Sequence, residues 1–330
     1  MSRCVFRVVV TVLMTLLVAR PGRADEGIVR DIGPQLASYG AVTDPERRLE
    51  ILQGIESLLG GRDTARSPEL SLLLLPILDD ESEACRRIGV RLLGSYGVPE
   101  TAVPRLRDLC EDLVCAEKEL WKAVDASKMP TPEKILEAPE AALEILGKRL
   151  RETERAVELA GKQLSLQNEL VESLSCLRDD RSVEALGILA ETQPPWNETL
   201  REALLRFGTR RALGHVAAMV RRGEDIRKER ETGLRKARSE RSGRPPRGRT
   251  NEQWLARERV RIQGLVDRAQ KGIDGLDERM ETVCARLRAF GEENGLRPAP
   301  VRVVPYGAWA SWLRWQAPAL PASVAEAAGE

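Results

Sequence analysis

The chain has 330 residues with 52 Lys or Arg, 51 Asp or Glu and a formal net charge of +1, a balance that singles out no polyanionic partner. It has one histidine and six scattered cysteines without a Cys-x-x-Cys pair, which argues against a zinc site and against a disulfide framework. We therefore predict neither a metal nor a cofactor.

Residues 1–24 are typical of a cleaved signal peptide. Arginines precede an apolar core of about eleven residues, shorter than the ~20 residues of a membrane span. Gly22-Arg23-Ala24 then has the small-x-small form of a cleavage site. We expect export, to the periplasm or outside the cell, after cleavage near Ala24.

Residues 25–126 are predicted to form short helices packed in antiparallel pairs. Thr43-Asp44-Pro45-Glu46 is a helix start signal. An apolar run at 72–78 ends at Asp79-Asp80, and the next segment has apolar residues at steps of three and four up to Gly97. Such a pair has about the 30–40 residues of a helical-solenoid repeat.

At these residues the chain resembles the HEAT-repeat family. The resemblance rests on residues 76–80 (Pro-Ile-Leu-Asp-Asp), Arg91 and Leu93-Gly94, and on a second match in residues 170–220 that contains Asp179-Asp180. It implies an all-α fold, a short HEAT-like α-solenoid, with repeats in residues 25–126 and again in 179–222. It also implies a surface for binding other proteins and implies no activity.

Two long helices interrupt this pattern. Residues 127–178 contain a proline-rich linker and then a coiled-coil helix whose seam alternates steps of three and four. The seam residues are Leu143, Leu146, Leu150, Thr153, Val157, Ala160, Leu164, Gln167, Val171 and Leu174. Residues 251–294 form the second long helix. We expect the two helices to pack antiparallel as an arm; the competing explanation is a homodimer in which they pair between chains.

Residues 223–250 are predicted to form a basic, solvated helix and a flexible linker. Residues 221–261 hold fifteen Arg or Lys against seven Asp or Glu, so this stretch is locally positive. Arg244, Arg247 and Arg249 are candidates for contact with an anionic surface, and a solvated linker without a partner is the alternative. The export signal and the lack of interleaved aromatic residues disfavour nucleic acid as a partner.

The tail, residues 295–330, contains Trp309, Trp312 and Trp315. Such an apolar cluster folds back on the chain, docks on a partner or sits at a membrane interface, and all three remain open at this point. The end of the tail is expected to be disordered.

The sequence contains no catalytic motif, and its one histidine, His215, fits a packed helix position. We therefore expect no enzyme and no catalytic residue. The prediction is a non-catalytic scaffold that binds another protein, of unknown identity, through its repeat surface or coiled-coil arm. The alternative is an envelope-tethering protein that contacts anionic surface material through residues 221–261 and the tryptophan tail.

Overall fold

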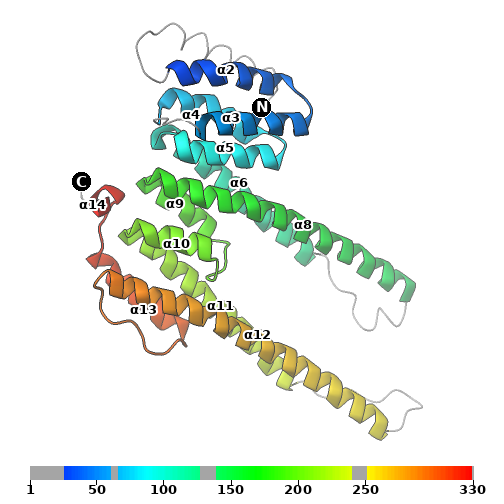
Figure 1. Ribbon diagram of the computed structural model, residues 1–330. Helices are drawn as coiled ribbons and strands as arrows, with labels where there is room; N and C mark the ends of the chain where they lie inside the picture. The colour runs from blue at the N-terminus through cyan, green and yellow to red at the C-terminus, as the bar shows by residue number, and fades with distance from the viewer. Residues whose placement is uncertain (1–25, 61–65, 127–138, 240–250, 329–330) are drawn as a thin grey trace. The chain divides into compact units, whose positions relative to one another are not determined.

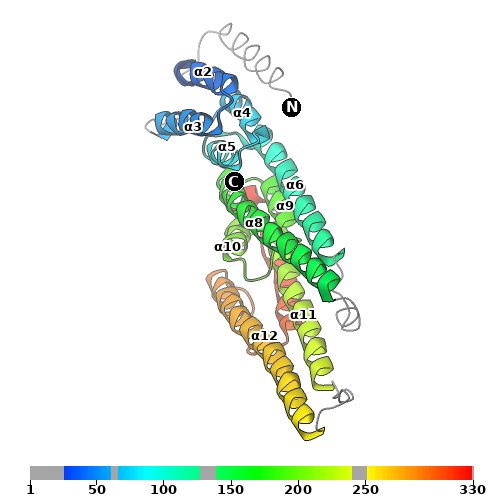
Figure 2. The same ribbon diagram turned by 90° about the vertical axis from the view of Figure 1, so that its right-hand side faces the viewer.

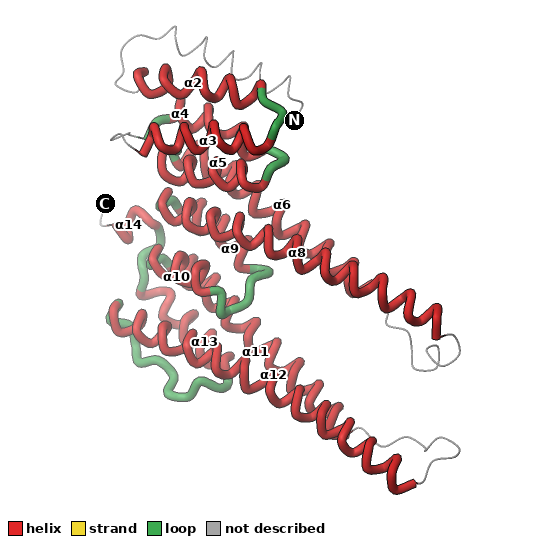
Figure 3. Tube along the Cα trace, turned by 45° about the vertical axis from the view of Figure 1, so that its right-hand side comes forward, coloured by secondary structure: helices red, strands yellow, loops and turns green. Residues whose placement is uncertain are grey.

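The computed structural model describes residues 26–60, 66–126, 139–239 and 251–328 (Figure 1). All regular structure in these ranges is helical, as Figure 3 shows, so the predicted all-α class is confirmed. The chain forms two compact units, residues 1–192 and 193–330. The predicted signal peptide lies outside the described ranges. Among the helices inside them, none is long and apolar enough to cross a membrane.

The first unit is a series of helices in which most pack on a neighbour in sequence. They are α2 (Glu26–Ala41), α3 (Pro45–Gly60), α4 (Pro68–Leu74), the 3-10 helix η1 (Leu75–Asp79), α5 (Glu83–Tyr96), α6 (Pro99–Ala126), α8 (Pro139–Leu177) and α9 (Asp180–Ala190). Helix α2 packs on α3 and α4 on α5, while α8 packs on both α5 and α6. Figure 2 shows α6 and α8 side by side along their length.

Helix ends in this unit follow the sequence signals. Helix α3 begins at Pro45 as predicted, and the Asp44 carboxylate accepts a hydrogen bond from the Glu46 amide at 3.2 Å. Helix α5 ends at Gly97, also as predicted. The apolar run at 72–78 differs from a single helix, because the chain tightens into η1 at Leu75, next to Pro76.

The turn at Asp79-Asp80 holds three segments together through one buried carboxylate. Asp80 accepts hydrogen bonds from the Tyr39 hydroxyl of α2, from Arg48 Nη1 of α3 at 2.6 Å, and from the Ser82 amide before α5 at 2.7 Å. Its side chain is only 2% exposed. A charge-assisted network of this kind has directional geometry, so it fixes the placement of α2 and α3 on the turn.

The carboxyl-terminal half of α8 is a core helix, because α5 approaches it very closely. A Cβ atom added to Gly94 would lie 2.5 Å from the Ser173 Cβ atom, so a larger residue at position 94 would separate the two helices. Leu166, Leu170 and Leu174 of α8 are buried in this region. The amino-terminal half of α8 packs on α6.

The second unit is organised around α11. It contains α10 (Glu198–Phe207), α11 (Arg210–Ser239), α12 (Asn251–Glu293), α13 (Tyr306–Gln316), the 3-10 helix η2 (Ala317–Ala319) and α14 (Val324–Ala328). Helix α11 packs on α10, α12 and α13. The prediction of a long helix over 251–294 agrees with α12 to within one residue.

The predicted pairing of the two long helices with each other is wrong. Helix α8 packs on α5 and α6 in the first unit, and α12 packs on α11 in the second. A seam pattern shows that a helix needs a partner without showing which one.

The basic stretch that was expected to be loosely held is the partner of α12. Helix α11 runs without a break to Ser239, and Leu234 on it is buried. Arg227 Nε donates to the Asp277 carboxylate of α12 at 3.0 Å, and Arg230 donates to the Gly272 carbonyl. Polar contacts of the basic stretch therefore add to the apolar packing of α12.

Two further boundaries differ from the predictions. The predicted repeat segment 179–222 is divided, because α9 belongs to the first unit and α10 and α11 to the second. The end of the tail, expected to be disordered, forms α14. Ser323 and Glu326 explain it as a capping box, since the Ser323 hydroxyl accepts from the Glu326 amide at 3.1 Å and the Glu326 carboxylate accepts from the Ala322 amide at 2.6 Å.

Replacing Asp80 with alanine should destabilise the first unit by about 3–5 kcal/mol, because the buried Arg48 guanidinium would lose its carboxylate partner. Urea unfolding followed by far-UV circular dichroism measures this, and hydrogen exchange localises the loss to residues 26–60. The neighbouring Asp79→Ala is the matched control. Asp79 pairs with Arg105 at 2.9 Å at the surface, so its loss should cost at most about 1 kcal/mol. Equal effects of the two substitutions would contradict the role given to Asp80.

Candidate functional site

The structure separates the three tryptophans that the sequence grouped as a candidate interaction site. Trp309 is fully buried and Trp312 is 6% exposed, whereas Trp315 is 80% exposed. Trp309 Nε1 donates to the Arg302 carbonyl at 2.8 Å, and Trp312 Nε1 donates to the Arg297 carbonyl at 3.0 Å. The first two tryptophans are therefore core residues of the second unit, and only the third can meet a partner.

Helix geometry explains this division. At about 100° per residue, every third residue lies about 60° further round the helix, so Trp315 lies about 120° from Trp309. Trp309 and Trp312 contact each other edge to face, with ring centroids 6.0 Å apart. Residues that repeat every third position therefore turn away from the packed face of a helix within two repeats. The spacing of the three tryptophans in the sequence already indicates this.

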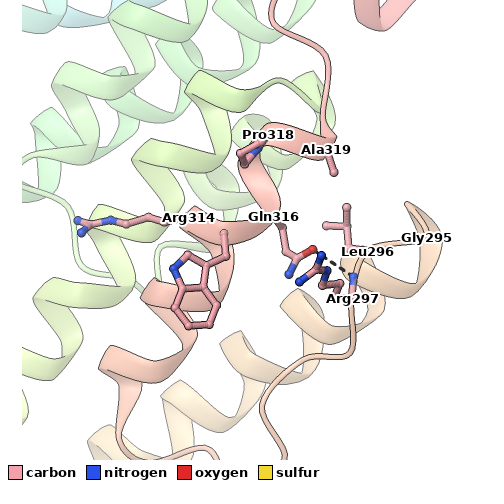
Figure 4. Close-up of a pocket in the computed structure, with 8 residues that line it drawn as sticks. Gly295, Leu296, Arg297, Arg314, Gln316, Pro318 and Ala319 are labelled. Carbon is pink, nitrogen blue, oxygen red and sulfur yellow. Dashed lines mark hydrogen bonds between the residues drawn. The ribbon is translucent and has the colours of Figure 1, made fainter.

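A surface hollow of about 620 Å³ lies at Trp315 (Figure 4). Residues 295–297 and 314–316, with Pro318 and Ala319, line it. The buried Gln316 side chain accepts a hydrogen bond from the Arg297 amide at 3.1 Å. Figure 4 shows the Arg314 side chain pointing away from Arg297 and Gln316, so the two guanidinium groups do not converge on one point. The lining has an aromatic ring and hydrogen-bond donors but no carboxylate or imidazole for acid–base chemistry.

The three arginines predicted to contact an anionic surface are not described by the structure. Arg244, Arg247 and Arg249 lie outside the described residues. Three described arginines of α11 bond to α12: Arg227 to Asp277, Arg230 to the Gly272 carbonyl and Arg238 to Gln270. These α11 arginines support the hairpin with α12.

A second candidate surface runs along α8 from its amino-terminal half to just past its middle. Leu143, Leu150, Val157 and Leu164 occupy every seventh position and are 68%, 60%, 61% and 46% exposed. We call these four residues the outer row. They belong to the predicted coiled-coil seam, which was expected to be covered by the second long helix.

The outer row is exposed because α6 covers another side of α8. Ala156, 2% exposed, marks the covered side, and Arg149 and Gln163 at the same heptad position are partly buried. On a helical projection the outer row lies about 100° away from that position, since each row residue directly follows a residue of it. Helix α8 thus has apolar residues on two sides and a covering helix on one of them.

The cysteines offer little chemistry. Cys85, Cys110 and Cys284 are buried, and burial raises the pKa of each thiol, that of Cys284 to about 12. His215 lies part-exposed on α11. Within the described ranges no group of three or more His, Cys, Asp or Glu residues could hold a metal ion.

Comparison with models of protein families gives no match, and comparisons with curated proteins and with solved structures give none either. The resemblance to HEAT repeats therefore stays a prediction from the sequence.

Trp309→Ala should destabilise the second unit by about 3–5 kcal/mol, because it removes a fully buried ring. Trp315→Ala is the control from the same helix and should change the free energy of unfolding by no more than about 0.5 kcal/mol. Urea unfolding followed by circular dichroism distinguishes them. A stable Trp309→Ala protein would show that the tail does not belong to the core.

Thiol titration of residues 25–330 at pH 8 should modify Cys115 and Cys176 only, since these are the exposed cysteines of the described chain. Raising the pH to 9 should leave Cys284 unmodified, because its pKa of about 12 keeps the thiol protonated. All five cysteines should react in urea, and the double variant Cys115→Ser/Cys176→Ser should show no native reaction. Rapid modification of a third thiol would mean that the cores open readily.

Proposed function

We propose that this protein is a non-catalytic helical scaffold that binds another protein through the outer row of α8. The observation that carries the proposal is the regular exposure of Leu143, Leu150, Val157 and Leu164. An isolated exposed leucine is normal at a protein surface, but a row with a heptad period has the geometry that receives a second helix.

The energy available at such a surface is sufficient for recognition. Fully burying an exposed leucine or valine side chain contributes about 1.5–3 kcal/mol, so four such residues supply a substantial part of a specific interface. Arg151, Glu154 and Glu158 lie exposed beside the outer row and give it a charged rim. An apolar centre with a charged rim is the usual organisation of a binding surface.

The proposal also includes the type of helical fold, a short solenoid with a coiled-coil arm. Helices of the first unit pack on their neighbours in sequence, and this supports a short HEAT-like solenoid from which α6 and α8 continue as a coiled-coil arm. The leader-like residues 1–24 support export and cleavage near Ala24, to the periplasm or beyond.

Envelope tethering is the second candidate, supported by Trp315 and the nearby Arg297 and Arg314. It has the weaker support of the two, because Trp309 and Trp312 are in the core and the two arginines diverge. Attachment to anionic material through arginine would weaken steeply as the salt concentration rises, whereas binding through the outer row would not.

A photo-crosslinking residue at Glu154, between Leu150 and Val157, should form a specific adduct with another polypeptide in the producing cell. The substitutions Leu150→Glu/Val157→Glu should abolish the adduct, because two charges would have to be buried. Gel mobility and mass spectrometry detect and identify the product.

The matched control introduces the same charges outside the outer row, as Lys148→Glu/Arg155→Glu. Both positions are exposed on another face of α8, so the adduct should persist. Circular dichroism should show that both double variants fold, since all four positions are exposed. An adduct that survives Leu150→Glu/Val157→Glu would count against the outer row as the binding surface.

A further inference from the structure

Helix α12 carries a line of cations along one side. Steps of three and four residues, which follow one side of a helix, connect the positions of this line. They are Gln253, Arg257, Arg261, Gly264, Arg268, Lys271 and Gly275, of which four are cationic and none is acidic. We call Arg257, Arg261, Arg268 and Lys271 the basic row. It extends for about 21 Å at ~1.5 Å per residue.

The basic row faces away from the helix that packs on α12. All four of its side chains are exposed. The buried residues Ile273 and Leu276 mark the side that α11 covers, and the centre of the row lies about 125° further round the helix. At Gly264 and Gly275 no described atom lies within 4 Å of the position that a Cβ atom would occupy. Figures 1 and 2 show α12 continuing past the described end of α11, so the row is open to a partner.

The neighbouring acids neutralise little of this charge. Glu258 pairs with Arg261 at 2.7 Å, whereas the other three cations of the row form no ion pair with any described residue. Asp267 and Asp274 lie about 85° or more from the centre of the row and accept hydrogen bonds from glutamines, at 2.8 and 2.9 Å. Four cations less the one paired with Glu258 leave three positive charges on the row.

The same line continues into the body of the second unit, and there its arginines have partners. Arg279 lies over the Trp196 ring, 5.3 Å from its centroid, and Arg286 pairs with Glu202 at 2.9 Å. A solvated helix face ordinarily mixes charges of both signs. A line of cations without an acid is instead complementary to an anionic partner.

We infer that the basic row binds the anionic phosphate headgroups of a phospholipid bilayer. Cations on one line of a straight helix can meet a plane together, and guanidinium groups bind phosphate oxygens in pairs of hydrogen bonds. Val260 is 74% exposed and lies about 65° from the centre of the row, where an apolar side chain can enter the headgroup region. The inference rests on envelope tethering, the second proposed function, and assigns the contact to α12 in place of the hollow at Trp315.

Cosedimentation of residues 25–330 with lipid vesicles tests the inference. The chain should bind vesicles of phosphatidylcholine with phosphatidylglycerol at low salt and should not bind vesicles of phosphatidylcholine alone. Arg257→Gln/Arg268→Gln should weaken binding about 25-fold, because each cation near an anionic bilayer contributes about 5-fold. Failure of the wild-type chain to bind the anionic vesicles would overturn the inference.

The matched control, Arg235→Gln/Arg259→Gln, removes the same charge from the same two helices. Both residues are exposed; Arg259 lies about 165° from the centre of the row, and Arg235 is on α11. Binding should fall less than about 3-fold, since neither residue belongs to the row. Equal losses in the two double variants would assign binding to net charge and overturn the role of the row. Displacement by soluble polyphosphate at the phosphate concentration of the vesicles would overturn the bilayer as the partner.

A fluorescent label reports which side of α12 meets the bilayer. In the Cys115→Ser/Cys176→Ser background, an environment-sensitive label at Gly264→Cys should shift its emission to shorter wavelength on anionic vesicles. The same label at Gln263→Cys should not, because Gln263 lies about 100° round the helix from Gly264 and away from the row. Equal shifts at the two positions would mean that α12 presents no fixed side to the bilayer, and would overturn the inference.

Failure of this inference is distinguishable from failure of the proposed functions. Vesicle binding that is lost with Arg297→Gln/Arg314→Gln and kept with Arg257→Gln/Arg268→Gln would retain tethering and overturn the basic row. An absence of vesicle binding would overturn both the row and tethering to a bilayer. The adduct at the outer row of α8 tests the protein-binding scaffold separately, since none of these substitutions lies on α8.

Discussion

In each unit, one carboxylate accepts hydrogen bonds from a tyrosine and an arginine that come from other helices. The two sets are Tyr39, Asp80 and Arg48 in the first unit and Tyr306, Asp277 and Arg227 in the second. Apolar packing holds helices together without fixing how far one slides along another, whereas these bonds have direction. Burial and the adjacent carboxylate raise the pKa of both tyrosines, so each remains a neutral donor at physiological pH. The rest of each unit is built on these fixed points.

The two long helices are covered unequally along their lengths. The carboxyl-terminal half of α8 lies against α5, where Gly94 meets Ser173, while the amino-terminal half has only α6 beside it. A helix with apolar residues on two sides and one covering helix must leave one side in water or give it to another chain. The apolar residues Ile273 and Leu276 of α12 are buried, because α11 and the tail cover the helix at these positions. The coverage of each segment, more than its sequence pattern, decides whether an apolar row becomes core or binding surface.

The sequence predicted the helices better than their partners. Pro45, Gly97 and the long helix from residue 251 mark ends that depend on local chemistry, and local chemistry is readable along a chain. The partner of α12 was not readable, because α11 contacts it through arginines that look like a solvated face. The candidate site was predicted in part: the outer row was recognised as a seam, and Trp315 as an interaction residue. The hollow at Trp315 gave no signal, since its walls come from the chain after α12 and the end of α13.

The exposure of the outer row is best explained as a property of one chain in isolation. Leaving four large apolar residues in water at a regular spacing favours aggregation unless a defined partner covers them. Arg151, Glu154 and Glu158 lie exposed on one side of the row, so a partner that covers the row must also accommodate charge on that side.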